Sequence, residues 1–368
     1  MKLVPFLLEQ WLGKYRDSVA HHLGMSTGPK WTLPELRALM TDAERGAFDE
    51  AELTYTPGHG REPLRAALAS LYGAHAEEVL VFTDGAEALL ALFFVASEPG
   101  ANVVVPSPSF APFVQLPESL GLETRRYVLR QEQGFAVDVD EVIRLVDRHT
   151  TLILLNSPHN PSGALIPEDA IRALDEFAAR RGISLVVDEV YHPIYHGTTA
   201  RSAGEYSRAT VLGDFSKSFS LPGLRIGWLL ERDDKRRAEL ANAHEHFVVS
   251  SSMLSELLAE VATRNRAKIW DRARSVSARN LALLDEWCAD HEERIEWLRP
   301  RGAMTAFPRL REDEDARPFC VAAAKRGVLV APGDCFGAPQ HFRIGFGLEM
   351  PRYAAALDLL GETLRAGA

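Results

Sequence analysis

The chain has 368 residues, of which 46% are hydrophobic and 25% charged, a composition typical of a soluble globular protein with room for two domains. Its 41 basic and 51 acidic side chains give a net charge of -10, which argues against general affinity for nucleic acid or anionic membranes. No apolar run approaches the ~20 residues of a membrane span, and the cysteines Cys288, Cys320 and Cys335 lack the spacing of a metal site. We expect a cytoplasmic protein with reduced cysteines and no metal.

The N-terminal segment, residues 1–45, is expected to form an arm and part of a small domain. Its first predicted helix runs from Leu33 to Met40, with Thr32 as a suitable N-cap. A loop rich in proline and glycine follows and carries Tyr55, which on its own is better explained as a packing residue. Another helix is predicted from about Glu62 to Tyr72.

A series of short, almost continuous apolar runs then alternates with helical segments: 79–83, 102–106, 151–156, 184–191 and 210–215. Such runs are typical of parallel strands covered by helices on both faces. Ligands of these sheets bind beyond the carboxyl ends of the strands. We therefore expect one site to be formed by the residues at or just past these ends, which are Thr83, Phe110, Asn160, Asp188, Tyr191, Ser216 and Lys217.

The junction after the first of these strands is a possible anion site. Asp84, Gly85 and Ala86 begin a helix directly, and small residues there leave backbone N–H groups free at the positive end of the helix. The alternative is that Thr83 or Asp84 only caps the helix, and this motif alone favours capping.

Lys217 follows the last strand of the series. A lysine that forms a Schiff base has to lie in a partly buried pocket, where a neutral amine is available. Arg225 comes eight residues later in a glycine turn, and its planar fork suits a phosphate, together with Ser216. A solvent-exposed loop lysine would be the simpler explanation if the serine–lysine pair stood alone.

Asp188 ends a buried strand and has no basic residue nearby in sequence. A buried carboxylate needs a cationic partner, and a protonated pyridine nitrogen is one that would keep the ring an electron sink. Tyr191 and Asn160 could donate hydrogen bonds to an oxygen on such a ring. Phe110 could stack on its face.

The rest of the chain predicts a second, smaller α+β domain. Residues 233–296 have a long helical pattern, short strands are predicted at 304–307, 328–332 and 341–347, and a helix is predicted from 351 to 364. We place the large cofactor-binding domain at residues 46–240 and the small C-terminal domain at 241–368.

Taken together, these motifs resemble those of fold-type I pyridoxal-phosphate enzymes of the class I/II aminotransferase family. The segments that carry the resemblance are NSPHNPSG at 156–163, DEVY at 188–191, SKSFSLPGLRIG at 216–227 and FRIGF at 342–346. The resemblance implies a large domain with a mostly parallel seven-stranded sheet covered by helices, a smaller α+β C-terminal domain, and a homodimer with shared active sites. It also implies pyridoxal 5'-phosphate as the cofactor.

By the same resemblance, Lys217, Asp188 and Tyr191 are the expected catalytic residues, with Lys217 forming the aldimine with the cofactor. Arg343 would bind the substrate α-carboxylate bidentately, with Asn160 beside it, and Tyr55 would reach the phosphate of the neighbouring subunit. The full set expected to bind the cofactor is Asp84, Gly85, Ala86, Phe110, Asn160, Asp188, Tyr191, Ser216, Lys217, Arg225 and Tyr55.

The expected activity is transfer of the α-amino group of an amino acid to a 2-oxo acid. Residues 33–39 and 301–309 resemble the branch of the family that contains capreomycidine synthase, which cyclises a hydroxylated arginine. Cyclisation or elimination on an arginine-like amino acid, or decarboxylation, is therefore the alternative. The complete run Glu189-Val190-Tyr191 is typical of aminotransferases and favours transamination.

Two other classes of protein are disfavoured. A cofactor-sensing regulator built on this fold would need an N-terminal DNA-binding module, and the first 45 residues are too few and insufficiently basic for one. A nicotinamide-dependent enzyme is disfavoured because no GxGxxG motif follows an early strand.

Overall fold

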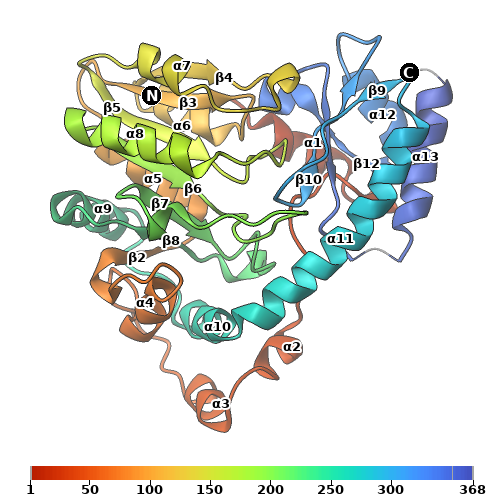
Figure 1. Ribbon diagram of the computed structural model, residues 1–368. Coiled ribbons are helices and arrows are strands. Elements are labelled where there is room, and N and C mark those ends of the chain that lie inside the picture. The colour runs from red at the N-terminus through yellow and green to blue at the C-terminus, as the bar shows by residue number, and fades with distance from the viewer. Residues whose placement is uncertain (1, 350, 367–368) are drawn as a thin grey trace.

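A twisted seven-stranded sheet forms the centre of the computed structural model, which describes residues 2–349 and 351–366 (Figure 1). The strand order is β2-β8-β7-β6-β5-β3-β4, and neighbours are parallel except that β8 runs antiparallel to both β2 and β7. The mostly parallel sheet is therefore confirmed. Its strands are β2 (Val79–Phe82), β3 (Asn102–Ser107), β4 (Glu123–Val128), β5 (Thr150–Asn156), β6 (Ser184–Asp188), β7 (Thr210–Asp214) and β8 (Gly227–Leu230).

Each predicted apolar run corresponds to one of these strands, whereas β4 has no apolar run. It lies at the edge of the sheet and pairs only with β3, and most of its side chains reach solvent. Tyr127 is its buried anchor, with a hydroxyl that donates to the Leu154 carbonyl oxygen at 3.0 Å. An edge strand can be polar because only part of it is covered by other elements.

Helices cover both faces of the sheet, so that alternate residues of every strand except β4 enter two separate cores. In β2, Val81 belongs to one hydrophobic cluster and Leu80 to the other. The Leu80 side is covered by α5 (Gly85–Val95), α6 (Pro112–Ser119) and α9 (Asp234–Phe247). The Val81 side is covered by α4 (Glu62–Ala69), α7 (Val139–Leu145) and α8 (Glu168–Arg181), and α10 (Met253–Arg264) packs on α4.

The N-terminal arm contains a helix that the sequence interpretation missed. This helix, α1 (Leu7–Tyr15), buries Leu8, Trp11 and Leu12, and the Trp11 indole N–H donates to the Val330 carbonyl oxygen at 2.8 Å. Further along the arm, Thr32 is the N-cap of a helix, as predicted. It forms a capping box, in which the Thr32 hydroxyl accepts the Glu35 N–H and the Glu35 carboxylate accepts the Thr32 N–H. The remaining elements of the arm are β1 (His21–His22), α2 (Leu33–Arg37) and α3 (Asp42–Asp49).

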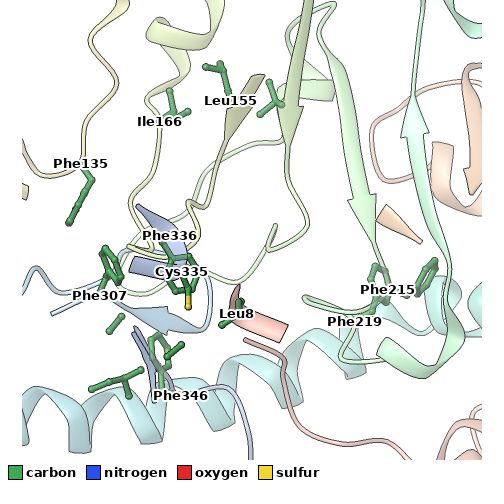
Figure 2. Packing of buried hydrophobic residues seen from close by; sticks show 14 of the residues in the cluster. Leu8, Phe135, Leu155, Ile166, Phe215, Phe219, Phe307, Cys335, Phe336 and Phe346 are labelled. Atoms are coloured by element: carbon green, nitrogen blue, oxygen red, sulfur yellow. The ribbon is translucent and has the colours of Figure 1, made fainter. Parts of the chain in front are cut away.

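The C-terminal part contains small sheets packed against long helices (Figure 1). The hydrophobic cluster that contains Val81 continues into this part, where it includes Phe307, Cys335, Phe336 and Phe346 together with Leu8 of α1, as Figure 2 shows. The arm is tied to this part because β1 pairs in parallel with β12. The elements are α11 (Arg266–Asp290), β9 (Ile295–Glu296), β10 (Thr305–Ala306), β11 (Arg309–Leu310), α12 (Arg317–Lys325), β12 (Val328–Leu329), β13 (Ala331–Pro332), β14 (Phe342–Gly345) and α13 (Tyr353–Ala366).

The predicted domain limit between residues 240 and 241 falls inside α9, which packs on α5 of the large sheet. The domain limits stay a prediction. The described residues also form five short 3-10 helices: η1 (Ala76–Glu78), η2 (Gln131–Gln133), η3 (Ala203–Glu205), η4 (Pro222–Leu224) and η5 (Gly333–Phe336).

All three cysteines are free and buried. None of the described helices combines the length and the apolar character that a membrane crossing requires. The cytoplasmic location stays a prediction.

Candidate active site

A cavity of about 390 Å³ opens at the carboxyl ends of β5, β6 and β7. The predicted site residues meet there although they come from distant parts of the chain. Tyr55 and Thr83 are the exceptions, since neither lines this cavity of its own chain: the Tyr55 side chain is 78% exposed, and the Thr83 N–H donates to Glu87 Oε2 at 2.6 Å. The predicted residues that do line it are Asp84, Gly85, Ala86, Phe110, Asn160, Asp188, Tyr191, Ser216, Lys217, Arg225 and Arg343.

Lys217 lies just beyond β7, on a turn that buried aromatic residues hold in place. Phe215 and Phe219 are fully buried, with ring centroids 4.6 Å apart. Lys217 itself is half-buried, and its Nζ donates to Ser26 Oγ at 3.2 Å. The amine that the sequence predicts to hold the cofactor therefore enters the cavity from a rigid turn and meets the N-terminal arm.

Asp188 is a buried acid without a cationic partner in the described part of the chain. It is 5% exposed, and its Oδ1 accepts the Val190 N–H at 3.0 Å. Burial raises the pKa of Asp188 to about 7; the Asp214 carboxylate adds to this rise, and the Lys217 ammonium opposes it. A protonated pyridine nitrogen would supply the missing positive charge, so this residue fits the predicted cofactor.

The N–H groups at the N-terminus of α5 bind carboxylate oxygens. The Gly85 N–H donates to Asp214 Oδ2 at 2.9 Å, the Ala86 N–H donates to Asp84 Oδ1 at 3.1 Å, and Arg225 forms an ion pair with Asp84. Asp84 therefore caps the helix, as the alternative interpretation had it. The same donors suit a phosphate, which would take the place of a carboxylate there.

A glycine in β8 allows this junction to form. A Cβ atom on Gly227 would lie 2.5 Å from the Gly85 nitrogen, closer than real contacts allow. Because Gly227 has none, β8 can pass directly against the first turn of α5.

Arg343 of β14 is 2% exposed, which is unusual for a guanidinium. It donates to Asn160 Oδ1 at 3.0 Å and to the Gly24 carbonyl oxygen at 2.7 Å, and it lies over the Phe336 ring. Its Nε–H finds no acceptor among the described residues. Burial lowers the pKa of Arg343. A buried guanidinium with a free N–H is suited to bind a carboxylate.

Sequence reasoning missed the contribution of the N-terminal arm. Tyr191, which is 1% exposed, donates from its hydroxyl to the Ser26 carbonyl oxygen at 3.3 Å. Apolar residues at positions 8, 11, 12 and 15 have the spacing of one helix face and could have revealed α1. The overlooked residues that line the cavity are Phe6, Leu8, Glu9, Leu12, Met25, Ser26 and Thr27 of the arm, and Asp214 of β7.

Comparison with known proteins identifies the family of the chain. Residues 27–360 match the model of aminotransferase class I and II. Capreomycidine synthase of Streptomyces vinaceus is 32% identical over 363 residues, which cover 97% of this chain and 93% of that protein. An aspartate/prephenate aminotransferase of Thermus thermophilus is 29% identical over 339 residues, 88% of this chain and 86% of that one.

Solved structures agree over the whole length. A PLP-dependent aminotransferase from Streptococcus suis superposes with a TM-score of 0.93 at 27% identity, and the PLP-dependent cyclase OrfR with 0.90 at 29%; each match covers 100% of this chain and 99% of the other. The fold is therefore fold type I, and pyridoxal phosphate, the cofactor of these enzymes, suits the buried acid, the lysine and the anion-binding helix end of the cavity. The chain belongs to the family of class I and II aminotransferases and is a pyridoxal-phosphate-dependent enzyme.

Proposed function

We propose that this enzyme transfers the α-amino group of an amino acid to a 2-oxo acid. The observation that carries the proposal is that Lys217, Asp188 and Arg343 line one cavity. An amine that can form a Schiff base, a buried acid that lacks a cation and a buried guanidinium with a free N–H are the three groups that the reaction needs.

Different residues of the cavity would bind the ring and the phosphate of the cofactor. Asp188 would pair with the ring nitrogen, and Asn160 and Tyr191 would bind the ring oxygen. Arg225 and Ser216, with the N–H groups of α5, would hold the phosphate. When bound, pyridoxal phosphate supplies an aldehyde that condenses with amines and a ring that withdraws electrons from the Cα–H bond of the substrate.

The protein's own part in the reaction is to bind the substrate and to move one proton. Arg343 would hold the α-carboxylate in a fixed position, so that the Cα–H bond faces the Lys217 amine. Lys217 would accept the Cα proton as a general base and return it to the cofactor carbon C4′ as a general acid. The N-terminal arm, through the contact between Ser26 and Tyr191, would limit the access of water.

Elimination with cyclisation of a hydroxylated arginine-like amino acid is a second candidate. The similarity to capreomycidine synthase and to OrfR favours it, whereas the complete run 188–191 favours transamination. Both reactions begin with loss of the Cα proton. They differ afterwards, because transamination leaves the amino group on the enzyme and elimination does not.

Single-substrate turnover distinguishes the two reactions. We would incubate the cofactor-loaded enzyme with single amino acids, including arginine and hydroxyarginine, without a 2-oxo acid. Transamination predicts one equivalent of keto acid per site, and turnover that resumes when 2-oxoglutarate or pyruvate is added. Sustained turnover without an acceptor would show that the cyclase or lyase function is the right one.

Arg343→Ala is expected to raise KM by about a hundredfold, because two charge-assisted hydrogen bonds to a carboxylate contribute about 3 kcal/mol. Steady-state kinetics would measure the change, and a melting curve would show whether the variant is folded. Arg279→Ala, which removes an arginine that is 66% exposed on α11, serves as the control. A KM within about twofold of wild type would contradict the assignment of Arg343.

Tyr55 and its neighbour Leu53 are large side chains that are 78% and 82% exposed, which supports a homodimer in which the partner covers this loop. We expect sedimentation to give a dimer. Tyr55→Phe should weaken retention of the cofactor by roughly tenfold through the loss of one hydrogen bond to a charged group. Tyr206→Phe is the control. A fully active monomer in sedimentation would exclude shared sites.

A further inference from the structure

The helix α1 forms one wall of the cavity and is anchored at its N-cap and at its middle. Phe6, its N-cap residue, packs edge-on against Phe110, with ring centroids 5.8 Å apart. Further along, the Trp11 indole N–H donates to the Val330 carbonyl oxygen at 2.8 Å, and the Arg317 guanidinium lies over the Trp11 ring. The backbone of α1 is therefore held in a fixed position relative to the cofactor and substrate residues.

Glu9 is the acidic side chain that α1 adds to the cavity wall. It is exposed and, within residues 2–349 and 351–366, its carboxylate takes part in no hydrogen bond or ion pair. The other acids of the cavity are engaged. Asp84 pairs with Arg225, Asp214 accepts the Gly85 N–H, and Asp188 is the partner assigned to the ring nitrogen.

The positive groups of the cavity, by contrast, are all assigned. Among the described residues that line it, the lysines and arginines are Lys217, Arg225 and Arg343. They are needed for the cofactor link, the phosphate and the α-carboxylate. None remains for a second substrate carboxylate, whereas the charge of Glu9 acts on the substrate site: burial lowers the pKa of Arg343, and the Glu9 carboxylate is among the groups that oppose this shift.

We propose that Glu9 binds the positively charged end of the substrate side chain, so that the enzyme selects amino acids with a guanidinium or ammonium group. The proposal rests on the proposed function, since it takes Arg343 as the anchor of the α-carboxylate. A substrate with a cationic side chain would place its α-carboxylate at Arg343 of β14 and its positive end at Glu9 of α1. A dicarboxylic amino acid would instead bring a like charge to Glu9, which disfavours it.

Arginine and citrulline give the sharpest test, because citrulline has nearly the same shape and lacks the charge. We would titrate the cofactor-loaded enzyme with each and follow the absorbance of the bound cofactor, adding ornithine to separate ammonium from guanidinium binding and glutamate as the dicarboxylic case. Arginine is expected to bind about tenfold more tightly than citrulline, between the effect of an exposed ion pair and that of a buried charged hydrogen bond.

Glu9→Gln should remove most of this preference by weakening arginine about tenfold and citrulline less than twofold. Glu98→Gln, which removes an exposed acid outside the cavity, is the matched control and should keep the preference for arginine over citrulline. Because an acid in the first turn also stabilises a helix, melting curves would show that the variants are folded, and Glu9→Lys should improve the binding of glutamate relative to arginine.

Equal binding of arginine and citrulline by the wild-type enzyme would overturn the proposal even if no variant folded. So would tighter binding of glutamate, or an arginine preference that survives in Glu9→Gln. In each of these cases the enzyme still reacts with amino acids, and the proposed function stands. A cofactor spectrum that no amino acid changes would instead contradict the proposed function itself.

Discussion

Lys217→Ala is expected to abolish the covalent link to the cofactor and to lower kcat by at least about a thousandfold. Two roles are lost together, because the same amine forms the link and moves the substrate proton, and general acid–base catalysis alone contributes about 10² to 10⁴ in rate. Lys217 is the lysine that lines the cavity in the described part of the chain, where its Nζ contacts Ser26.

Borohydride reduction of the loaded enzyme, followed by peptide mass mapping, would measure the link directly. We expect the reduced adduct on Lys217 in the wild-type enzyme and none in Lys217→Ala. Lys235→Ala provides the control, since Lys235 is 87% exposed on α9. An adduct on a different lysine of the wild-type enzyme would show that this assignment is wrong.

Asp188→Asn is expected to keep the fold and some cofactor but to lower kcat by about a hundredfold or more. The amide cannot hold the ring nitrogen protonated, and removing one partner of a buried charge pair costs about 3–5 kcal/mol, where each 1.4 kcal/mol corresponds to about tenfold in rate. Turnover under saturating substrate would measure the loss. Near wild-type turnover would exclude the role of Asp188.

The same substitution should stabilise the cofactor-free protein, although it lowers kcat. The pKa of Asp188 rises from 3.8 to about 7 on folding because the carboxyl is buried. Below pH 3.8 the group is protonated in both states and costs nothing. As the pH rises from 3.8 to about 7, the unfolded chain loses this proton while the folded protein keeps it, so the free energy of unfolding falls by roughly 4 kcal/mol in total and stays at that lower level above pH 7.

Urea unfolding of the cofactor-free proteins at pH 5 and pH 8 would test this sign. Asp188→Asn should gain stability relative to wild type between the two values. Glu189→Gln is the matched comparison, because burial also raises the pKa of Glu189 to about 7, although its carboxylate accepts hydrogen bonds from Ser202 and Ala203. A difference between wild type and Asp188→Asn that does not change with pH would contradict the buried, unpaired state of Asp188.

The sequence alone was sufficient for the parallel strands in the interior of the sheet and for the residues at their carboxyl ends. Strands such as β5 and β6 are buried on both faces, so each has to be a continuous apolar run, and a parallel arrangement brings their ends to the same edge. Asp188 and Lys217 could be recognised because a buried acid without a basic neighbour and a lysine after an apolar strand are locally unusual.

Only the tertiary structure decided which strand forms the edge of the sheet and what closes the cavity. The edge strand β4 is too polar to be predicted from its own residues, and α1 is a short helix whose partner, β13, lies more than three hundred residues away in sequence. Glu9 and Ser26 carry no local signal of a role, because an acid or a serine in these segments is ordinary. They enter the site through long-range packing, which brings the N-terminal arm over the sheet edge and which no local pattern encodes.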